Sequence, residues 1–214
     1  MDYSTLRELM VMQQISARGI TNKAVLCAMK TVPRHLFVSQ PLIDEAYGDF
    51  PLPIGLNQTI SQPYIVALMT EQLQLQADHK VLEIGTGCGY QTAVLAEIVD
   101  QVYTIEIVPE LAERARQTLK RLNYHNIHSR CGDGLNDWSE QAPFDRIIVT
   151  AAPDILPQAL IEQLSIGGHM VIPIGSLQQV LYRITRLSEN QIETQVLSQV
   201  RFVTMTGKIQ EREL

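Results

Sequence analysis

From residue 80 onward, short apolar runs alternate with segments in which apolar residues recur every three or four positions. The runs are typical of strands buried on both faces, and the spaced pattern is typical of amphipathic helices. The expected strands are 80–84, 101–106, 126–131, 144–149 and 169–174, and the expected helices between them are about 90–99, 109–123 and 157–164. This alternation predicts an α/β fold, a mostly parallel sheet with helices on both faces.

The two ends of the chain follow other patterns. Helical spacing before the sheet predicts an N-terminal extension over 4–18 and 22–32, and a further helix from Pro63 to about Gln76. Residues 33–62 contain four prolines and little periodicity, so we expect a long irregular loop of the kind that orders over a ligand. After residue 175, two alternating segments predict an antiparallel hairpin at the sheet edge, over 179–187 and 191–201.

These patterns predict a single domain built in three parts. The expected parts are N-terminal helices with a lid loop (1–62), an αβ core (63–175), and a C-terminal hairpin with a tail (176–214). A chain of 214 residues with 45% hydrophobic content can bury one full core.

Composition then excludes several classes of protein. The net charge is −6 and lysines and arginines form no cluster, which argues against a nucleic-acid-binding protein. No apolar run reaches the length of about 18 residues that spans a membrane. Three widely spaced cysteines and the lack of a recognisable leader predict a reduced, cytoplasmic setting. The histidines are scattered, so we expect no metal site, and we expect a monomer or a weak homo-oligomer.

Three glycines at alternate positions follow the first core strand, in the run Glu83-Ile84-Gly85-Thr86-Gly87-Cys88-Gly89. Glycine lacks the Cβ that would keep a ligand away from the backbone. The spacing differs from the G-x-G-x-x-G of dinucleotide enzymes. With Glu83 ahead of Gly85 and Gly87, it looks like the nucleoside-binding loop of S-adenosylmethionine (SAM) methyltransferases. A dinucleotide enzyme, and a turn that only packs a helix on the sheet, remain the alternatives.

Polar residues stand at the ends of the next two strands. Glu106 ends the second strand, where a carboxylate can accept hydrogen bonds from ribose hydroxyls. Asp133 and Gly134 follow the third strand, where the aspartate can accept the adenine amino group and the glycine lets the backbone approach the ring. Each feature alone also fits a solvated acid or a plain Asp-Gly turn. Their coincidence at consecutive strand ends favours a nucleoside site.

A second informative segment, Thr59-Ile60-Ser61-Gln62-Pro63, precedes a helix that begins with proline. On the residues alone, Ser61 or Gln62 reads as a helix cap. The segment, together with the glycine loop, Gly132-Asp133-Gly134 and Met170 through Gly175, nevertheless resembles the protein-L-isoaspartate O-methyltransferase family. The likeness covers nearly the whole chain, to about Gly207.

The resemblance implies a Rossmann-like methyltransferase fold with SAM as cofactor and S-adenosylhomocysteine as product. It implies that Ser61 is the catalytic serine, that Thr59, Ile60 and Ser61 lie over the methionine end of SAM, and that Tyr64 borders the acceptor pocket. The family's late Val-Pro-Leu segment, which holds the acceptor, corresponds to Val203-Thr204-Met205. Threonine in place of proline restores an N–H and frees φ, so we expect a less rigid edge.

The implied activity is methylation of the α-carboxylate of isoaspartyl residues in damaged proteins, which starts their repair. The isoaspartyl protein is the expected partner, with no nucleic acid and no membrane. Two alternatives keep the SAM fold: a carboxyl methyltransferase with another peptide or small acid as acceptor, and a SAM-binding protein without activity. A nucleic-acid methyltransferase fits the fold alone but not the acidic charge.

Overall fold

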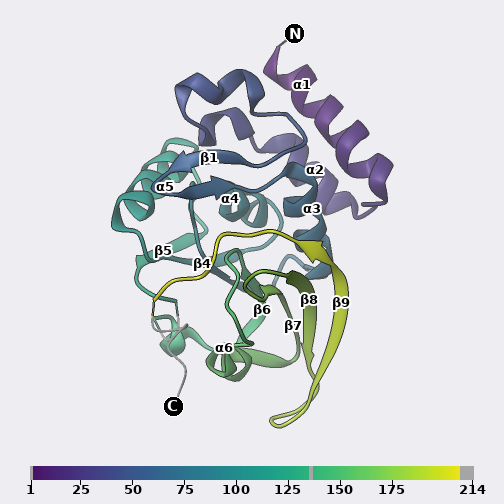
Figure 1. The fold of residues 1–214 in the computed structure, drawn as a ribbon, viewed down its shortest axis with the longest axis vertical. Helices are drawn as coiled ribbons and strands as arrows, with labels where there is room; N and C mark the ends of the chain where they lie inside the picture. The colour runs from purple at the N-terminus through teal and green to yellow at the C-terminus, as the bar shows by residue number, and fades with distance from the viewer. Residues whose placement is uncertain (1, 135–136, 208–214) are drawn as a thin grey trace.

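The structure is a computed structural model that describes residues 2–134 and 137–207. Its centre is a seven-stranded sheet in the order β5-β4-β3-β6-β7-β8-β9 (Figure 1). The first five of these run parallel, and β8 and β9 each pair antiparallel with the preceding strand. The strands are β3 Lys80–Ile84, β4 Gln101–Glu106, β5 Ile127–Cys131, β6 Phe144–Val149, β7 Leu164–Ile174, β8 Gln179–Arg186 and β9 Ile192–Val200.

Helices cover both faces of the sheet. Alternate residues of a strand point to opposite faces, so Val81 packs with Met69 and Leu95 on one side, while Leu82 packs with Leu160 on the other. The first side is covered by α3 Pro63–Gln72 and α4 Tyr90–Ala96, and the second by α6 Gln158–Gln163; α5 Pro109–Arg121 contacts β4 and β5. The predicted fold class is confirmed, although α3 and α4 end earlier than expected.

The order of strands creates a crevice between β3 and β6. From β3 the chain winds outward to β4 and β5, and it then returns to the other side of β3 for β6 and β7. At such a reversal the connections leave in opposite directions, and ligands bind outside the carboxyl ends of the strands. The topology alone therefore marks one edge of the sheet as a ligand site.

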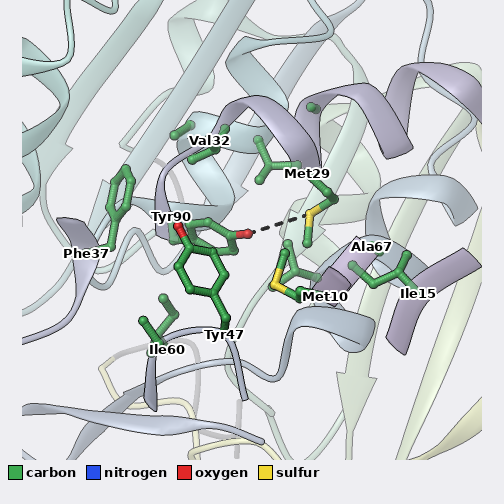
Figure 2. Close-up of a cluster of buried hydrophobic side chains, with 14 of the residues drawn as sticks. Met10, Ile15, Met29, Val32, Phe37, Tyr47, Ile60, Ala67 and Tyr90 are labelled. Atoms are coloured by element: carbon green, nitrogen blue, oxygen red, sulfur yellow. Dashed lines mark hydrogen bonds between the residues drawn. The ribbon is translucent and has the colours of Figure 1, made fainter. Parts of the chain in front are cut away.

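The N-terminal extension is less regular than predicted. Residues expected as one helix form α1 Tyr3–Leu9, a π-helix at Met10–Ile15 and a 3₁₀ turn at Ser16–Arg18, before α2 Lys23–Thr31. The extension packs on the core through a cluster of buried side chains around Tyr90, the first residue of α4 (Figure 2). Its hydroxyl lies 3.9 Å from the Met29 sulfur, and the Phe37 ring meets the Tyr90 ring edge-on.

The expected irregular loop over 33–62 contains regular structure, and this part of the prediction is wrong. It holds 3₁₀ turns at Arg34–Phe37 and Gln40–Glu45, and an antiparallel hairpin of β1 Leu52–Gly55 and β2 Gln58–Ile60. The turn of the hairpin places Leu56 and Asn57 at positive φ. The hairpin was not predicted because prolines usually argue against a strand, whereas Pro53 lies in a short edge strand that tolerates proline.

Strand β7 begins five residues before the expected position. Leu164 pairs with Phe144, and the next parallel pair is His169 with Arg146, so an irregular stretch of β7 separates them. Gly167 in that stretch has φ +81°, a conformation that glycine adopts without steric cost. Gly167 and Gly168 therefore lie in an irregular, bulge-like stretch within the strand.

Candidate active site

A cavity opens at the carboxyl ends of β3, β4 and β6, where the topology places a ligand site. It has about 920 Å³ of unfilled space, its open mouth included. Its wall combines the glycine loop after β3, the ends of β4 and β5, the segment Gln58–Ser61 and the late segment Val203–Thr206.

The glycine loop needs glycine for two separate reasons. Gly85, Gly87 and Gly89 have φ values of +96°, +55° and +88°, which other residues rarely adopt. A Cβ on Gly85 would lie 2.3 Å from Oγ1 of Thr150, and a Cβ on Gly89 would lie 3.3 Å from Leu119. The loop is thus wedged between β6 and α5, and Gly85 and Gly87 expose backbone to the cavity.

Glu106 lies at the end of β4 and lines the cavity, as its position in the sequence predicts. Its side chain is buried, and its two oxygens accept separate backbone hydrogen bonds. One accepts the N–H of Gly87 at 2.7 Å, and the other accepts the N–H of Val108 at 3.0 Å. The carboxylate therefore ties the glycine loop to the start of α5 at the cavity wall.

Of the two residues after β5 that we expected to bind the cofactor, Asp133 lines the cavity and Gly134 does not. Asp133 lines the cavity together with Gly132, whereas Gly134 lies behind the wall. Gly134 has φ +84°, and a Cβ there would lie 2.8 Å from Cγ2 of Ile84. Its conformation is required by close packing on β3, not by an approach to a ligand in the cavity.

Glu83 does not line the cavity, although we expected it to bind the cofactor. Its side chain is fully buried between β3 and α4, and one carboxyl oxygen accepts hydrogen bonds from Thr92 at 2.5 Å and Thr104 at 2.6 Å. Burial raises the pKa of Glu83 to about 8, against the opposing effect of the two threonine hydrogen bonds. This cluster could not be predicted from the sequence pattern, because its threonines come from separate elements.

The predicted acceptor side lies against a second cavity. Ser61, Thr59, Thr150 and Val203 line both cavities, so they form the boundary between them. Ile60 lines the first cavity only. The other residues that line the second cavity are Pro51, Gln62, Ile65, Val200, Arg201 and Phe202. Ser61 therefore lines both cavities.

The late segment is fixed to the sheet by backbone pairing. Ala152, just after β6, donates its N–H to Val203 and accepts the N–H of Met205 at 2.8 Å, and Thr204 bridges to the same residue. Val203 and Thr204 line the first cavity, and Met205 is buried. We expected the lack of proline at Thr204 to make this edge less rigid, but hydrogen bonds of its two neighbours, Val203 and Met205, hold the backbone on either side of it.

Tyr64 lines neither cavity. Its ring lies 3.6 Å beneath the guanidinium of Arg18, and it packs against the N-terminal hydrophobic cluster. Tyr64 is the second residue of α3, and the turn of the helix directs its side chain toward the extension. Tyr64 therefore lies outside both cavities, and its expected place beside the acceptor stays a prediction.

Two wall residues were missed by the sequence reasoning. Thr150 follows β6, and its hydroxyl lies 2.6 Å from the carbonyl oxygen of Gly85 and 3.0 Å from that of Ile84. A search of every strand end would have found it. Cys88 lines the cavity with a pKa that burial raises to about 11, so it is a neutral thiol at neutral pH and a poor nucleophile.

Across residues 2–134 and 137–207, no group of three or more His, Cys, Asp or Glu side chains is placed to hold a metal ion. No helix in the same ranges is long and apolar enough to cross a membrane.

The chain is similar to known proteins in both sequence and fold. The profile of the protein-L-isoaspartate(D-aspartate) O-methyltransferase family matches residues 6–210. A protein-L-isoaspartate O-methyltransferase of Picosynechococcus is 55% identical over 94% of this chain and 90% of its own, and one of Syntrophus aciditrophicus is 56% identical over 93% of each.

Among solved structures, a protein-L-isoaspartate O-methyltransferase superposes with a TM-score of 0.86 at 29% identity, covering 95% of this chain and 67% of its own. A crystal structure titled as such a methyltransferase, from Plasmodium falciparum and in complex with S-adenosyl-L-homocysteine, superposes with a TM-score of 0.82 at 27% identity. It covers 94% of this chain and 98% of its own.

Proposed function

Because the chain belongs to the protein-L-isoaspartate(D-aspartate) O-methyltransferase family, we propose that its two cavities bring SAM and an isoaspartyl peptide together at Ser61. The enzyme is a SAM-dependent protein carboxyl methyltransferase. The methyl group goes to the α-carboxylate of an isoaspartyl residue in a damaged protein, and this starts the repair of that protein.

The residues of the first cavity suit the cofactor. Backbone exposed at Gly85 and Gly87 leaves room for a ligand, and Glu106 and Asp133 offer carboxylate oxygens to ribose hydroxyls and to the adenine amino group. Thr59 and Ile60 close the opposite side of the same cavity. When bound, SAM supplies an electrophilic methyl group on a positively charged sulfur.

The main task of the protein in this reaction is to orient the acceptor carboxylate toward the methyl group of SAM. The acceptor carboxylate is already ionised at neutral pH, since such groups have pKa values of about 4. No general base is then required, and the rate depends on orientation and on removal of water from the carboxylate. Ser61, with its hydroxyl at the boundary of the two cavities, orients the acceptor by donating a hydrogen bond to it. Val203 and Thr204 form the wall beside that acceptor.

The observation that carries this proposal is the position of Ser61 in the walls of both cavities. The test is transfer of a tritiated methyl group from SAM to an isoaspartyl peptide, with the normal aspartyl peptide of the same sequence as control. We expect methylation of the first peptide only. Equal labelling of both, or of neither, would overturn the proposal in favour of another acceptor or of a binding protein.

Substitution of Ser61 separates orientation from helix capping. We expect Ser61→Ala to lower turnover about 10- to 100-fold, the loss typical of a hydrogen bond to a charged group, and to leave affinity for S-adenosylhomocysteine nearly unchanged. Ser4→Ala, on the exposed helix α1, is the matched control. An equal loss of turnover and affinity would indicate that Ser61 is structural.

We further propose that the enzyme works in the cytoplasm, without nucleic acid, as a monomer or a weak homo-oligomer. The net charge of −6 and three free cysteines, Cys27, Cys88 and Cys131, support the setting. Size-exclusion chromatography with light scattering tests the oligomeric state.

A further inference from the structure

Three oxygen atoms form a chain from the interior of the protein to the cofactor cavity, and a fourth, the Thr92 hydroxyl, donates to its inner end. One carboxyl oxygen of Glu83, Oε2, lies 2.6 Å from the Thr104 hydroxyl, which lies 2.6 Å from the Thr86 hydroxyl. Thr92 of α4 donates to the same Glu83 oxygen at 2.5 Å. Glu83, Thr92 and Thr104 are fully buried, whereas Thr86 lines the cavity. The geometry follows from register, since Glu83 of β3 is directly paired with Thr104 of β4.

Each threonine hydroxyl has one proton, so the charge of Glu83 decides which way the chain points. When Glu83 is ionised, Thr104 donates to it, and Thr86 must donate to Thr104. The Thr86 proton is then directed inward. When Glu83 is neutral, its proton can pass along the reversed chain: Glu83 donates to Thr104, and Thr104 donates to Thr86. The Thr86 proton is then free to point into the cavity.

The neutral carboxyl has only one useful place for its proton. Oε1 of Glu83 is buried and has no hydrogen-bond partner in the part of the chain that the structure describes. A proton on that oxygen would be an unsatisfied buried donor, which is costly. A proton on Oε2 reaches the Thr104 hydroxyl at 2.6 Å and the Thr92 hydroxyl at 2.5 Å. Donation to Thr92 would leave the proton of that buried hydroxyl without an acceptor among the described residues, whereas donation to Thr104 keeps Thr92 as a donor to Oε2 and passes the Thr104 proton to Thr86. The reversed chain is therefore the favoured arrangement of the neutral state.

The surroundings of Glu83 favour that neutral state near pH 7. The pKa of Glu83 is raised to about 8, chiefly by burial, against hydrogen bonds from Thr104 and Thr92 that lower it, and with a smaller increase from Glu106 at the end of β4. The Cys88 thiol of the glycine loop is close enough to interact electrostatically with Glu83, and burial raises its pKa to about 11, so it is neutral near pH 7. The neighbour of Glu83 on β6, Ile148, is apolar.

We propose that Glu83 is a positioning residue that acts on the cofactor through Thr104 and Thr86, and that only its neutral form turns the Thr86 hydroxyl into a hydrogen-bond donor to the bound cofactor. Ionisation of Glu83 withdraws that donor from the cavity without any movement of heavy atoms. The inference rests on the proposed function in one respect, since it takes the first cavity as the site of SAM and S-adenosylhomocysteine.

The test is the affinity for S-adenosylhomocysteine, measured by calorimetry on the full chain between pH 6.5 and 9.5. For the unchanged protein we expect affinity to fall about tenfold as the pH rises through about 8, the loss expected for one hydrogen bond. Glu83→Gln cannot ionise, so its affinity should lack this decline. The amino group of the ligand also titrates, but equally for every variant, so the difference between variants carries the result.

Two threonine variants distinguish a relay from simple structural support. Thr104→Val breaks the chain between Glu83 and Thr86 and should abolish the decline. Thr92→Val removes a hydrogen bond to the same carboxyl oxygen but lies outside the chain, so it should keep the decline, displaced toward higher pH. A structural role would make the two valine variants alike. Thr86→Val, which removes the donor itself, should bind weakly at every pH and is the alternative if Thr104→Val does not fold.

The outcomes separate this inference from the proposed function. A decline that persists in Glu83→Gln, or identical profiles for Thr92→Val and Thr104→Val, would overturn the relay. Failure of the unchanged protein to methylate an isoaspartyl peptide, while the predicted pH profiles hold, would overturn the proposed acceptor and leave the relay intact.

Discussion

The buried carboxyl of Glu83 should make the stability of the folded protein fall as the pH rises. Its pKa is raised from an ordinary value of 4.5 to about 8 in the folded protein. Between those values the folded state holds a proton that the unfolded state has lost. Stability therefore decreases with pH by about 1.4 kcal/mol per unit, the full slope of one proton. Below pH 4.5 both states hold the proton, and above about 8 neither does.

The slope of the unfolding free energy against pH reflects one proton and does not depend on the precise pKa of the folded state. Between pH 5.5 and 7.0 the contribution of Glu83 amounts to a loss of about 2 kcal/mol. His169 acts in the opposite sense over part of this range. Its pKa is lowered to about 4, chiefly by burial, so its stabilisation is lost as the pH falls below its ordinary value of 6.5. The raw curve of the unchanged protein thus mixes two effects.

Glu83→Gln isolates the carboxyl from that background. The amide leaves an unpartnered donor where Oε1 stands, at a cost of about 1–3 kcal/mol, but this cost is the same at every pH. The assay is urea unfolding of both proteins at pH 5.5, 6.25 and 7.0. We expect the difference in unfolding free energy to change by about 2 kcal/mol across the series, in the direction of a relatively more stable variant at pH 7.0. Parallel curves, within about 0.5 kcal/mol, would show that Glu83 is ionised throughout and would refute the reasoning.

Two further predictions concern the glycine loop and the lid segment. Gly85→Ala should abolish binding of S-adenosylhomocysteine and destabilise the fold, because the new Cβ would lie 2.3 Å from Oγ1 of Thr150. The control is Gly19→Ala, which has nearly the same φ but nothing within 4 Å, so it should cost only the backbone strain of about 1–2 kcal/mol; equal losses of stability in the two variants would show that the clash is not the cause. We also propose that the segment 33–62 closes over the cofactor, so S-adenosylhomocysteine should slow chymotrypsin cleavage at the exposed Phe50 and Leu56, and unchanged cleavage would contradict a lid.

The core was predictable because its information is local. Strands such as β6 are buried over nearly their whole length, and a continuous apolar run reports that burial without reference to partners. The hairpin at Leu52–Ile60 and the bulge after Leu164 depend instead on pairing with distant strands or on turn geometry. A sequence pattern does not carry that information, and both were missed.

Among the site residues, too, some could be placed from the sequence and others could not. Glu106 and Asp133 were found because the ends of parallel strands meet at one edge, so position along a strand suffices to place them. Glu83 and Tyr64 do not line either cavity, because the direction of a side chain does not follow from its place in the sequence motif alone. Glu83 stands one residue before the end of β3, and the alternation of the strand sends it toward α4, where Thr92 donates to it.

The two carboxyl groups next to the glycine loop have different partners, and that difference gives them different roles. Glu106 accepts N–H groups of Gly87 and Val108, which can donate but never accept, so its carboxylate is fixed as an acceptor. Glu83 meets only hydroxyls, which can reverse. Backbone donors thus hold one charge at the cavity wall, while hydroxyls let the other carboxyl keep its proton out of water and still influence the cavity. Replacing Thr104 by a residue that only donates would favour ionised Glu83, since the reversed chain would no longer exist.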